Sequence, residues 1–163
     1  MISAAPVSAE TTATDHLTTY GKSLFAAEIN HGPQVKISSA FSAAITTDTE
    51  GRVVAYNSIM GSPGKLVINE LLTGKQIKVL PLANLSAGSY ATLVHSSGDI
   101  YLSSHPHGIL YRYRPGAKEL DNLGHAHADV RFIWELEEVA DGKVALACYP
   151  DSRIVLFDPA NDT

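Results

Sequence analysis

Three things are scarce in this sequence: positive charge, cysteine and long apolar runs. Its 163 residues carry 12 Lys and Arg against 17 Asp and Glu, a formal net charge of −5, and they contain no basic run. Such a surface has little with which to neutralise phosphates or to bind an anionic bilayer. No apolar run approaches the roughly 20 residues of a membrane-spanning helix. We therefore expect neither nucleic acid nor a membrane as a partner.

The single cysteine and the N-terminal composition bear on the compartment. Cys148 excludes an internal disulfide, and its place in the strand-like run 144–149 indicates a small buried apolar side chain. Residues 1–23 are interpreted as a flexible leader rich in Ala, Ser and Thr, without the basic and apolar regions of a complete signal peptide. This small-residue composition favours an extracellular protein over a cytoplasmic one.

A convincing helical stripe over three turns is also missing, and a turn signature repeats instead. In each copy an acidic residue or Ser, a Gly and a polar residue precede an apolar run, as at Gly51, Gly98 and Gly142. The successive glycines are 47 and 44 residues apart, which gives a period of about 45.

Short apolar runs between turn residues predict up to four strands in each repeat. The predicted strands are 43–47, 53–57, 65–70 and 76–80 in the first repeat, 91–95, 100–104, 110–114 and 120–124 in the second, and 134–139, 143–149 and 153–158 in the third. One earlier strand is predicted at 24–29, before an Asn-His-Gly-Pro breaker.

Four short strands in every 40–50 residues or so resemble the repeats of the WD40/YVTN-like β-propeller class, over residues 24–158. The resemblance implies an all-β fold of four-stranded antiparallel blades. No Gly-His or Trp-Asp dipeptide stands where a WD40 repeat carries one, so the broader class is assigned. We expect a partial propeller over 24–163, with complete blades at 41–86 and 87–129 and an incomplete blade at 130–163.

Known propellers use about four to eight blades, so this organisation predicts an N-terminal fragment. Residues 24–40 are then the outer strand of the blade that closes the ring, with its connection. The expected partner is the rest of the same propeller.

Five of the seven histidines fall in connections that emerge on one face of such a propeller: His31, His105, His107, His125 and His127. Loops held by a rigid scaffold are common places for binding and catalytic groups, and imidazole exchanges protons near neutral pH. This face is our candidate site. The alternative is that each histidine makes only a local hydrogen bond.

Two His-x-His pairs, His105 with His107 and His125 with His127, could also supply metal ligands, with Asp129 or His31 as a third. Pro106 interrupts the first pair, and no third ligand is fixed by its spacing. We therefore predict no cofactor and leave a divalent metal as the open alternative.

Arg131 begins the innermost strand of the third repeat, where a cation could meet an anionic ligand. In the strand 110–114 the side chains of Tyr111 and Arg112 point to opposite sides, and Tyr111 is also a candidate for packing between blades. Together with His31, these residues are expected to contact a small-molecule or polysaccharide ligand.

The segment Ser104-His105-Pro106-His107-Gly108, followed by Leu110-Tyr111-Arg112-Tyr113, resembles propeller-fold polysaccharide lyases over a small part of the chain. The resemblance implies elimination across a uronate. His105 or His107 would then act as base or acid, His125 or His127 as its partner, and Arg131 as the carboxylate clamp.

Other enzyme classes lack their usual motifs, since no GxSxG, HExxH, Walker A or dinucleotide fingerprint occurs. Glu137, Glu138 and Asp141 lie by a turn on the opposite face and are interpreted as solvated charges. The alternative to an enzyme is a non-catalytic propeller module that binds protein or sugar on the face with the histidines.

Overall fold

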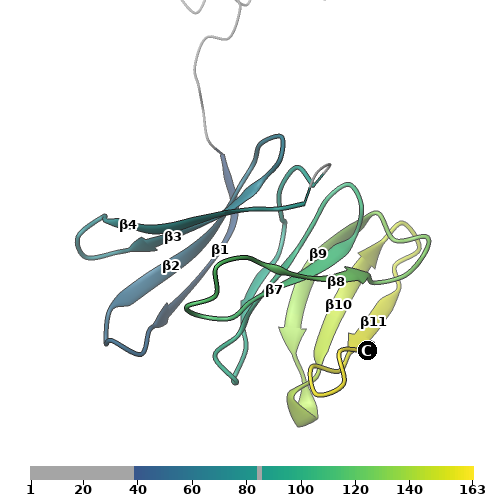
Figure 1. Ribbon diagram of the computed structural model, residues 1–163. Helices are drawn as coiled ribbons and strands as arrows, with labels where there is room; N and C mark the ends of the chain where they lie inside the picture. The colour runs from purple at the N-terminus through teal and green to yellow at the C-terminus, as the bar shows by residue number, and fades with distance from the viewer. Residues whose placement is uncertain (1–38, 84–85) are drawn as a thin grey trace, which may run out of the picture. The chain divides into compact units, whose positions relative to one another are not determined.

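Strands make up nearly all the regular structure in this computed structural model, which describes residues 39–83 and 86–163 (Figure 1). They form three antiparallel sheets, and in each sheet strands that follow one another in the chain are neighbours. The first sheet consists of β1 (Ala40–Thr47), β2 (Val53–Ile59), β3 (Lys65–Glu70) and β4 (Gln76–Pro81), and the second of β5 (Thr92–Val94), β6 (Ile100–Ser103), β7 (Ile109–Tyr113) and β8 (Asp121–His125). The third sheet consists of β9 (Phe132–Glu138), β10 (Val144–Tyr149) and β11 (Ile154–Phe157). A short 3-10 helix, Ala140–Gly142, joins β9 to β10. None of the described residues forms a helix long and apolar enough to cross a membrane.

The predicted all-β fold of two four-stranded sheets and one three-stranded sheet is confirmed. The three repeated glycines explain why the turns could be found: Gly51, Gly98 and Gly142 have φ angles of 78°, 88° and 68°. This left-handed backbone is strained for residues with a Cβ atom and is readily adopted by glycine. The leader, the strand at 24–29 and His31 lie outside the described residues.

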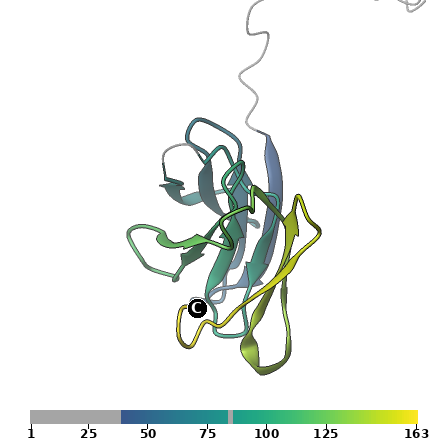
Figure 2. The same cartoon turned by 90° about the vertical axis from the view of Figure 1, so that its right-hand side faces the viewer.

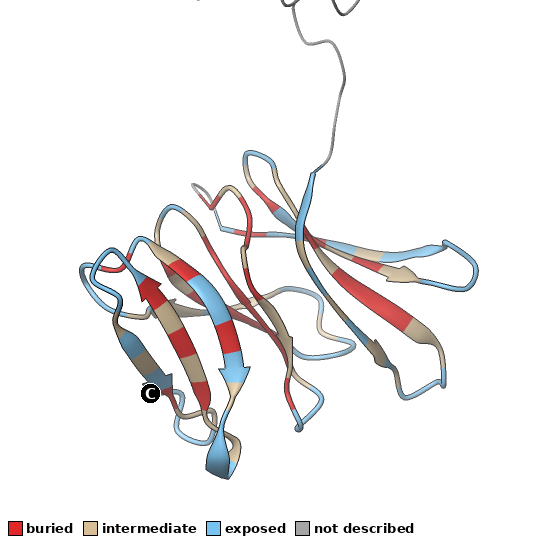
Figure 3. Cartoon of the chain, turned by 180° about the vertical axis from the view of Figure 1, so that it is seen from behind, coloured by how far each residue is buried: buried red, intermediate tan, exposed pale blue. Residues whose placement is uncertain are grey.

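Two apolar cores hold the three sheets together. One core joins the first sheet to the second and includes Val54, Leu66 and Ile68 against Ile100 and Leu102. The other joins the second sheet to the third, with residues such as Tyr101, Leu110, Ile133, Val144 and Leu146. Most buried positions lie on the strands, and the tips of the turns are exposed (Figure 3).

The strand β6 shows how the second sheet serves both cores. All four of its residues are buried, and alternate side chains enter opposite faces: Ile100 and Leu102 join the first core, and Tyr101 joins the second. Complete burial of an apolar side chain of this size contributes about 1.5–3 kcal/mol. A strand that is apolar on both sides therefore requires a sheet on each side.

The outward faces of the first and third sheets remain uncovered within the described residues. Ile45 in β1 is 61% exposed, and Ile154 and Leu156 in β11 are 63% and 58% exposed. These positions alternate with less exposed neighbours along their strands, so they mark an outward face. Figure 2 shows the sheets after a turn of 90°.

A chain of serine hydrogen bonds links all three sheets where the first strand of each sheet begins. The N–H of Ser89, just before β5, donates to Oγ of Ser58 in β2 (2.7 Å). Oγ of Ser42 in β1 donates to the Ser89 carbonyl (3.1 Å), and Oγ of Ser103 in β6 donates to the carbonyl of Ile133 in β9 (3.1 Å). The Oγ atoms of Ser89 and Ser103 are 3.1 Å apart, which connects the two halves of the chain of bonds.

At the other end of these strands, Glu138 joins the second and third sheets. Its carboxylate accepts hydrogen bonds from the N–H of Ser96 (2.7 Å) and from the Ser96 hydroxyl, and these bonds lower the pKa of Glu138. Nearby, Nε2 of His95 lies 2.9 Å from the Gly142 carbonyl. The interpretation of Glu138 as a simply solvated charge was therefore wrong.

Arg112 in β7 is a buried cation with two carboxylate partners. Its guanidinium donates two hydrogen bonds to Asp162 (2.6 and 3.2 Å) and one to Asp121 (3.2 Å). The bonds from Arg112 lower the pKa of Asp162. Since a buried charge is costly without a partner, Asp162 fixes the end of the third repeat against β7.

We predict that Asp162→Asn lowers the free energy of unfolding by about 1 kcal/mol at neutral pH. This value is at the low end of the range for hydrogen bonds between charged groups, because the side chain of Asp162 is half exposed. Since the folded-state pKa is lowered, the contribution is present above the ordinary carboxyl pKa of about 4 and is lost as the pH falls through the lowered pKa. Urea unfolding curves of wild type and variant should therefore differ at pH 7 and converge in acid.

The matched control is Asp151→Asn, which removes a carboxylate that pairs with Arg153 at the surface. Such pairs contribute little, so this change should leave the unfolding midpoint nearly unaltered. An equal loss in both variants at pH 7 would contradict the assigned role of Asp162.

Candidate functional site

Backbone hydrogen bonds fix the position of His105, which follows β6. Its carbonyl accepts a bond from the N–H of Ala87 (2.8 Å), and its own N–H donates to the Gly88 carbonyl (3.0 Å). This bridge ties the connection after β6 to the segment that leads into β5. His105 therefore lies beside the first strands of the sheets.

The His105 ring is surrounded by apolar and aromatic side chains. Its centroid is 4.8 Å from that of Tyr90 and 6.0 Å from that of Phe132, with the latter ring stacked at 25°. Nε2 lies 3.1 Å from Sδ of Met60. Burial lowers the pKa of His105 below its ordinary value of about 6.5, so the imidazole is mainly neutral at pH 7.

His105 belongs to a larger group that we name the inner-edge aromatic cluster, because its members lie on or beside β1, β5 and β9, the edge strands that adjoin from sheet to sheet. Its members are Phe41, Tyr90, His105, Phe132, Trp134 and Tyr149. Tyr90 connects the three sheets, with centroid distances of 5.3 Å to Phe41 and 4.7 Å to Trp134. Phe41, Trp134 and Tyr149 are 44%, 47% and 45% exposed, so the cluster presents aromatic surface to solvent.

Irregularities in strand pairing place two of these rings. In β1 the unpaired extra residue is Phe41, which lies between Ala40 and Ser42. In β9 it is Trp134, between Ile133 and Glu135. A β-bulge of this kind leaves one residue out of the ladder and changes the direction of its side chain.

The other predicted catalytic histidines are not gathered around His105. His125 lies on β8, at the opposite edge of the second sheet from β5, and it is exposed. His127 is exposed as well, and its Nδ1 accepts a hydrogen bond from the N–H of Asp129 (3.3 Å). His107 is partly exposed, two residues beyond His105 in the same connection. The described residues contain no group of three or more His, Cys, Asp and Glu that could hold a metal ion.

Two predicted substrate-binding residues lie in the interior. Tyr111 is buried in the first core, and its hydroxyl is 3.0 Å from Oγ of Ser86. Arg112 is buried with Asp162 and Asp121 as its partners. Because β7 is the third strand of a sheet that is packed on both faces, we leave both residues out of the candidate site.

Arg131 remains in the candidate site. It is exposed, it directly precedes Phe132, and its N–H donates to the carbonyl of Tyr149 (3.0 Å). No ion pair to Arg131 is formed by the described residues. The backbone of Arg131 is thus held next to Tyr149, a member of the inner-edge aromatic cluster.

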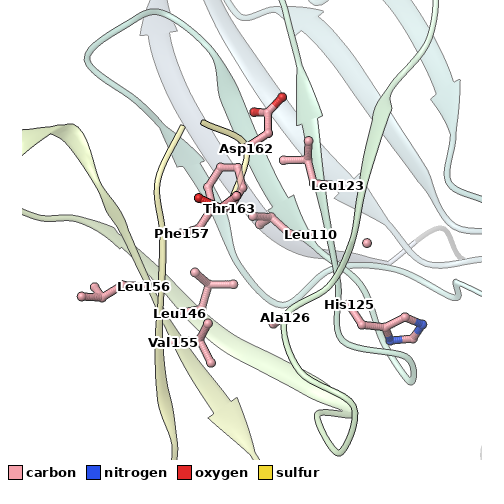
Figure 4. Close-up of a pocket in the computed structure, with 11 residues that line it drawn as sticks. Leu110, Leu123, His125, Ala126, Leu146, Val155, Leu156, Phe157, Asp162 and Thr163 are labelled. Atoms are coloured by element: carbon pink, nitrogen blue, oxygen red, sulfur yellow. The ribbon is translucent and has the colours of Figure 1, made fainter. Parts of the chain in front are cut away.

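A cavity of about 220 Å³ opens between β8 and β11, away from this cluster (Figure 4). Its lining is mainly aliphatic, with Leu110, Leu123, Leu146 and Val155, and His125 lies at one end. None of the cluster residues lines it. The volume is smaller than that of most ligand sites, so we do not place the candidate site there.

Sequence reasoning missed the aromatic members of the site, although a signal was present. Phe41, Tyr90 and Trp134 precede the repeated turn glycines Gly51, Gly98 and Gly142 by 10, 8 and 8 residues. One aromatic residue therefore recurs at nearly the same place in every repeat.

Comparison with known proteins supports the fold. No protein-family model matches the chain, and no curated protein matches it. A solved structure of virginiamycin B lyase from Staphylococcus aureus superposes with a TM-score of 0.53 at 13% identity, over 77% of this chain and 43% of that one. A second structure of that enzyme, a catalytically inactive variant with alanine in place of a histidine, solved with quinupristin, gives 0.52 at 14% identity, over 76% and 43%.

These likenesses show a propeller-type fold and leave function open. The chain spans less than half the length of the solved structures that it matches.

Gly108 offers a test of how the connection that carries His105 is held. Its φ is 58°, and an added Cβ atom would come within 2.7 Å of the Val130 carbonyl oxygen. We predict that Gly108→Ala lowers the free energy of unfolding by about 2–4 kcal/mol, from the strained φ together with the collision. Urea unfolding of the purified protein measures this change.

Gly116→Ala is the matched control, because φ is 91° there and nothing lies within 4 Å of an added Cβ atom. This variant should show only the backbone strain, about 1–2 kcal/mol. If the two variants lost the same stability, the close approach of Gly108 to Val130 would have no energetic importance.

Proposed function

We propose that this chain is part of a β-propeller lyase that eliminates across a uronate-containing glycan, with His105 as the general base. The main support for this proposal is the position of His105 in the inner-edge aromatic cluster. Its ring packs between Tyr90 and Phe132, next to aromatic side chains that are exposed to solvent. A general base must be close to its substrate and unprotonated at the working pH. Desolvation by its neighbours favours the neutral imidazole.

The proposed step starts with a lone pair on the imidazole. With a proton on Nε2, which faces Sδ of Met60, Nδ1 of His105 keeps its lone pair and removes the C5 proton of the uronate. The C5–H electrons form the C4–C5 double bond, and the C4–O bond to the leaving sugar breaks. His107 or solvent returns a proton to the leaving oxygen.

Arg131 would bind the carboxylate during this step. Loss of the C5 proton transfers negative charge onto the carboxylate oxygens, and a nearby guanidinium stabilises that charge. Its place beside Phe132, without an ion pair among the described residues, supports the assignment. His125 and His127 have no part in this proposal.

The fold relatives are compatible with such chemistry. The solved enzyme with the same fold is named a lyase, and the variant of it described as catalytically inactive has lost one histidine. Fold likeness at this identity supports only the general expectation that this scaffold can carry a histidine-dependent elimination.

We propose that further blades of the same propeller complete the site. The uncovered apolar faces around Ile45 in β1 and Ile154 in β11 fit the stacking of further blades, which is how a propeller buries both faces of each sheet. The rest of the same propeller is therefore the first partner that we propose. An extracellular location, where such glycans are accessible, is part of the same proposal.

We predict that the intact protein forms an unsaturated uronate product, followed by its ultraviolet absorbance. His105→Phe keeps the ring packing and removes the base, so product formation should fall at least a hundredfold. Because the pKa of His105 is lowered, wild-type activity should decline only below about pH 6.5, as the imidazole becomes protonated.

His125→Ala and His127→Ala are the controls and should keep most of the activity, because neither ring packs against the cluster. A loss as large as that of His105→Phe in either control would contradict the assignment of the base. Binding without any product, on every uronate glycan tried, would favour the non-catalytic module.

A further inference from the structure

The inner-edge aromatic cluster contains the only tryptophan of the chain, Trp134, which is nearly half exposed. It stacks on Phe132 with an interplanar angle of 15° and a centroid distance of 5.4 Å. Tyr90 and Tyr149 pack against the same two rings. The rings therefore hold one another in place and form a preorganised surface.

Charged residues flank the two rings in the sequence: Arg131 directly precedes β9, and Glu135 lies within it. Arg131 is just before Phe132, and Glu135 is just after Trp134, and both side chains are exposed. The two positions are four residues apart, roughly 13 Å along an extended strand. A ligand that runs along this strand past Phe132 and Trp134 would have Arg131 towards one end and Glu135 towards the other.

We propose that this surface binds a glycan in which a uronate alternates with a neutral sugar, the uronate at Arg131 and the neutral pyranose over Trp134. A pyranose has an apolar C–H face and a polar rim, which suits a half-exposed aromatic ring with polar neighbours. The Arg131 guanidinium attracts the uronate carboxylate. Glu135 repels a second carboxylate and accepts hydrogen bonds from neutral hydroxyl groups, so the adjacent sugar is neutral.

This proposal rests on the function proposed above, because it assigns the sugars on either side of His105. It goes beyond that function in naming Trp134, Phe132 and Glu135 as positioning residues and in excluding a homopolymer of uronate as the preferred ligand. Within the described residues, Trp134 and Tyr149 at this surface are 47% and 45% exposed.

Trp134 makes binding observable, because a fluorescence change that is present in wild type and absent in Trp134→Phe belongs to this ring. In the intact protein, an alternating uronate–neutral sugar glycan should cause this change at a concentration about tenfold lower than a homopolyuronate of equal length. Glu135→Gln should reduce that preference to near unity, since the repulsion of the second carboxylate is removed. An unchanged preference in Glu135→Gln, or tighter binding of the homopolyuronate to wild type, would overturn the proposal.

Calorimetric titration tests the ring itself, because Trp134→Ala has no tryptophan signal. Trp134→Ala should weaken binding of the alternating glycan about tenfold, and Trp134→Phe should recover most of the loss. Leu72→Ala is the matched control, an exposed apolar truncation in the turn between β3 and β4, outside the cluster, and should bind as wild type does.

The two proposals fail in different ways. A fluorescence change without unsaturated product leaves the glycan surface intact and removes the lyase function. Product formation that Trp134→Ala leaves unchanged keeps the lyase and removes the surface. Absence of both signals with every uronate glycan contradicts both.

Discussion

Packing of one sheet face against another is the interaction on which this structure depends. Each sheet is only three or four strands wide, and β6 in the second sheet is apolar on both sides. Ile100 and Leu102 cannot be buried unless the first sheet covers them, and Tyr101 cannot be buried unless the third sheet does. The stability of each repeat therefore comes largely from its neighbours, as expected for quasi-linear repeat architectures.

The same packing explains the small residues where the inner strands meet. Ser42, Ser58, Ser89 and Ser103 are close enough to hydrogen-bond across three sheets, which bulky side chains would prevent. Each of these bonds is modest on its own, about 0.5–1.5 kcal/mol, but together they fix the strand ends that carry Phe41, Tyr90 and Phe132. The inner-edge aromatic cluster thus lies beside a layer of hydrogen-bonded serines that holds these strand ends together.

The sequence predicted the strands well because local chemistry determines them. Gly51, Gly98 and Gly142 marked the turns, since their positive φ is a property of single residues. The candidate site was harder to predict, because the directions of its side chains depend on how the strands pair. A bulge at Phe41 or Trp134 changes which way the ring points, and nothing in a period-two pattern identifies the residue that leaves the ladder.

The same limit explains the histidines and the interior residues. The two His-x-His pairs look equivalent in the sequence. In the structure, His105 pairs with Gly88 in the segment before β5, whereas His125 ends β8, at the opposite edge of the second sheet. Tyr111 and Arg112 sit in a sequence segment that resembles lyases, but β7 is covered on both faces, so they serve packing and the ion pair with Asp162. Position across the sheet, which sequence alone does not give, separates the site residue from the structural ones.

On this scaffold, the protonation state of His105 would distinguish an enzyme from a binding module. A module needs only aromatic surface and hydrogen bonds, which Trp134 and its neighbours supply in either case. A lyase also needs an unprotonated base beside that surface, and a solvated histidine would be partly protonated below neutral pH. The burial that packs His105 between Tyr90 and Phe132 favours its neutral form, so the packing that builds the proposed ligand surface also favours the proposed base.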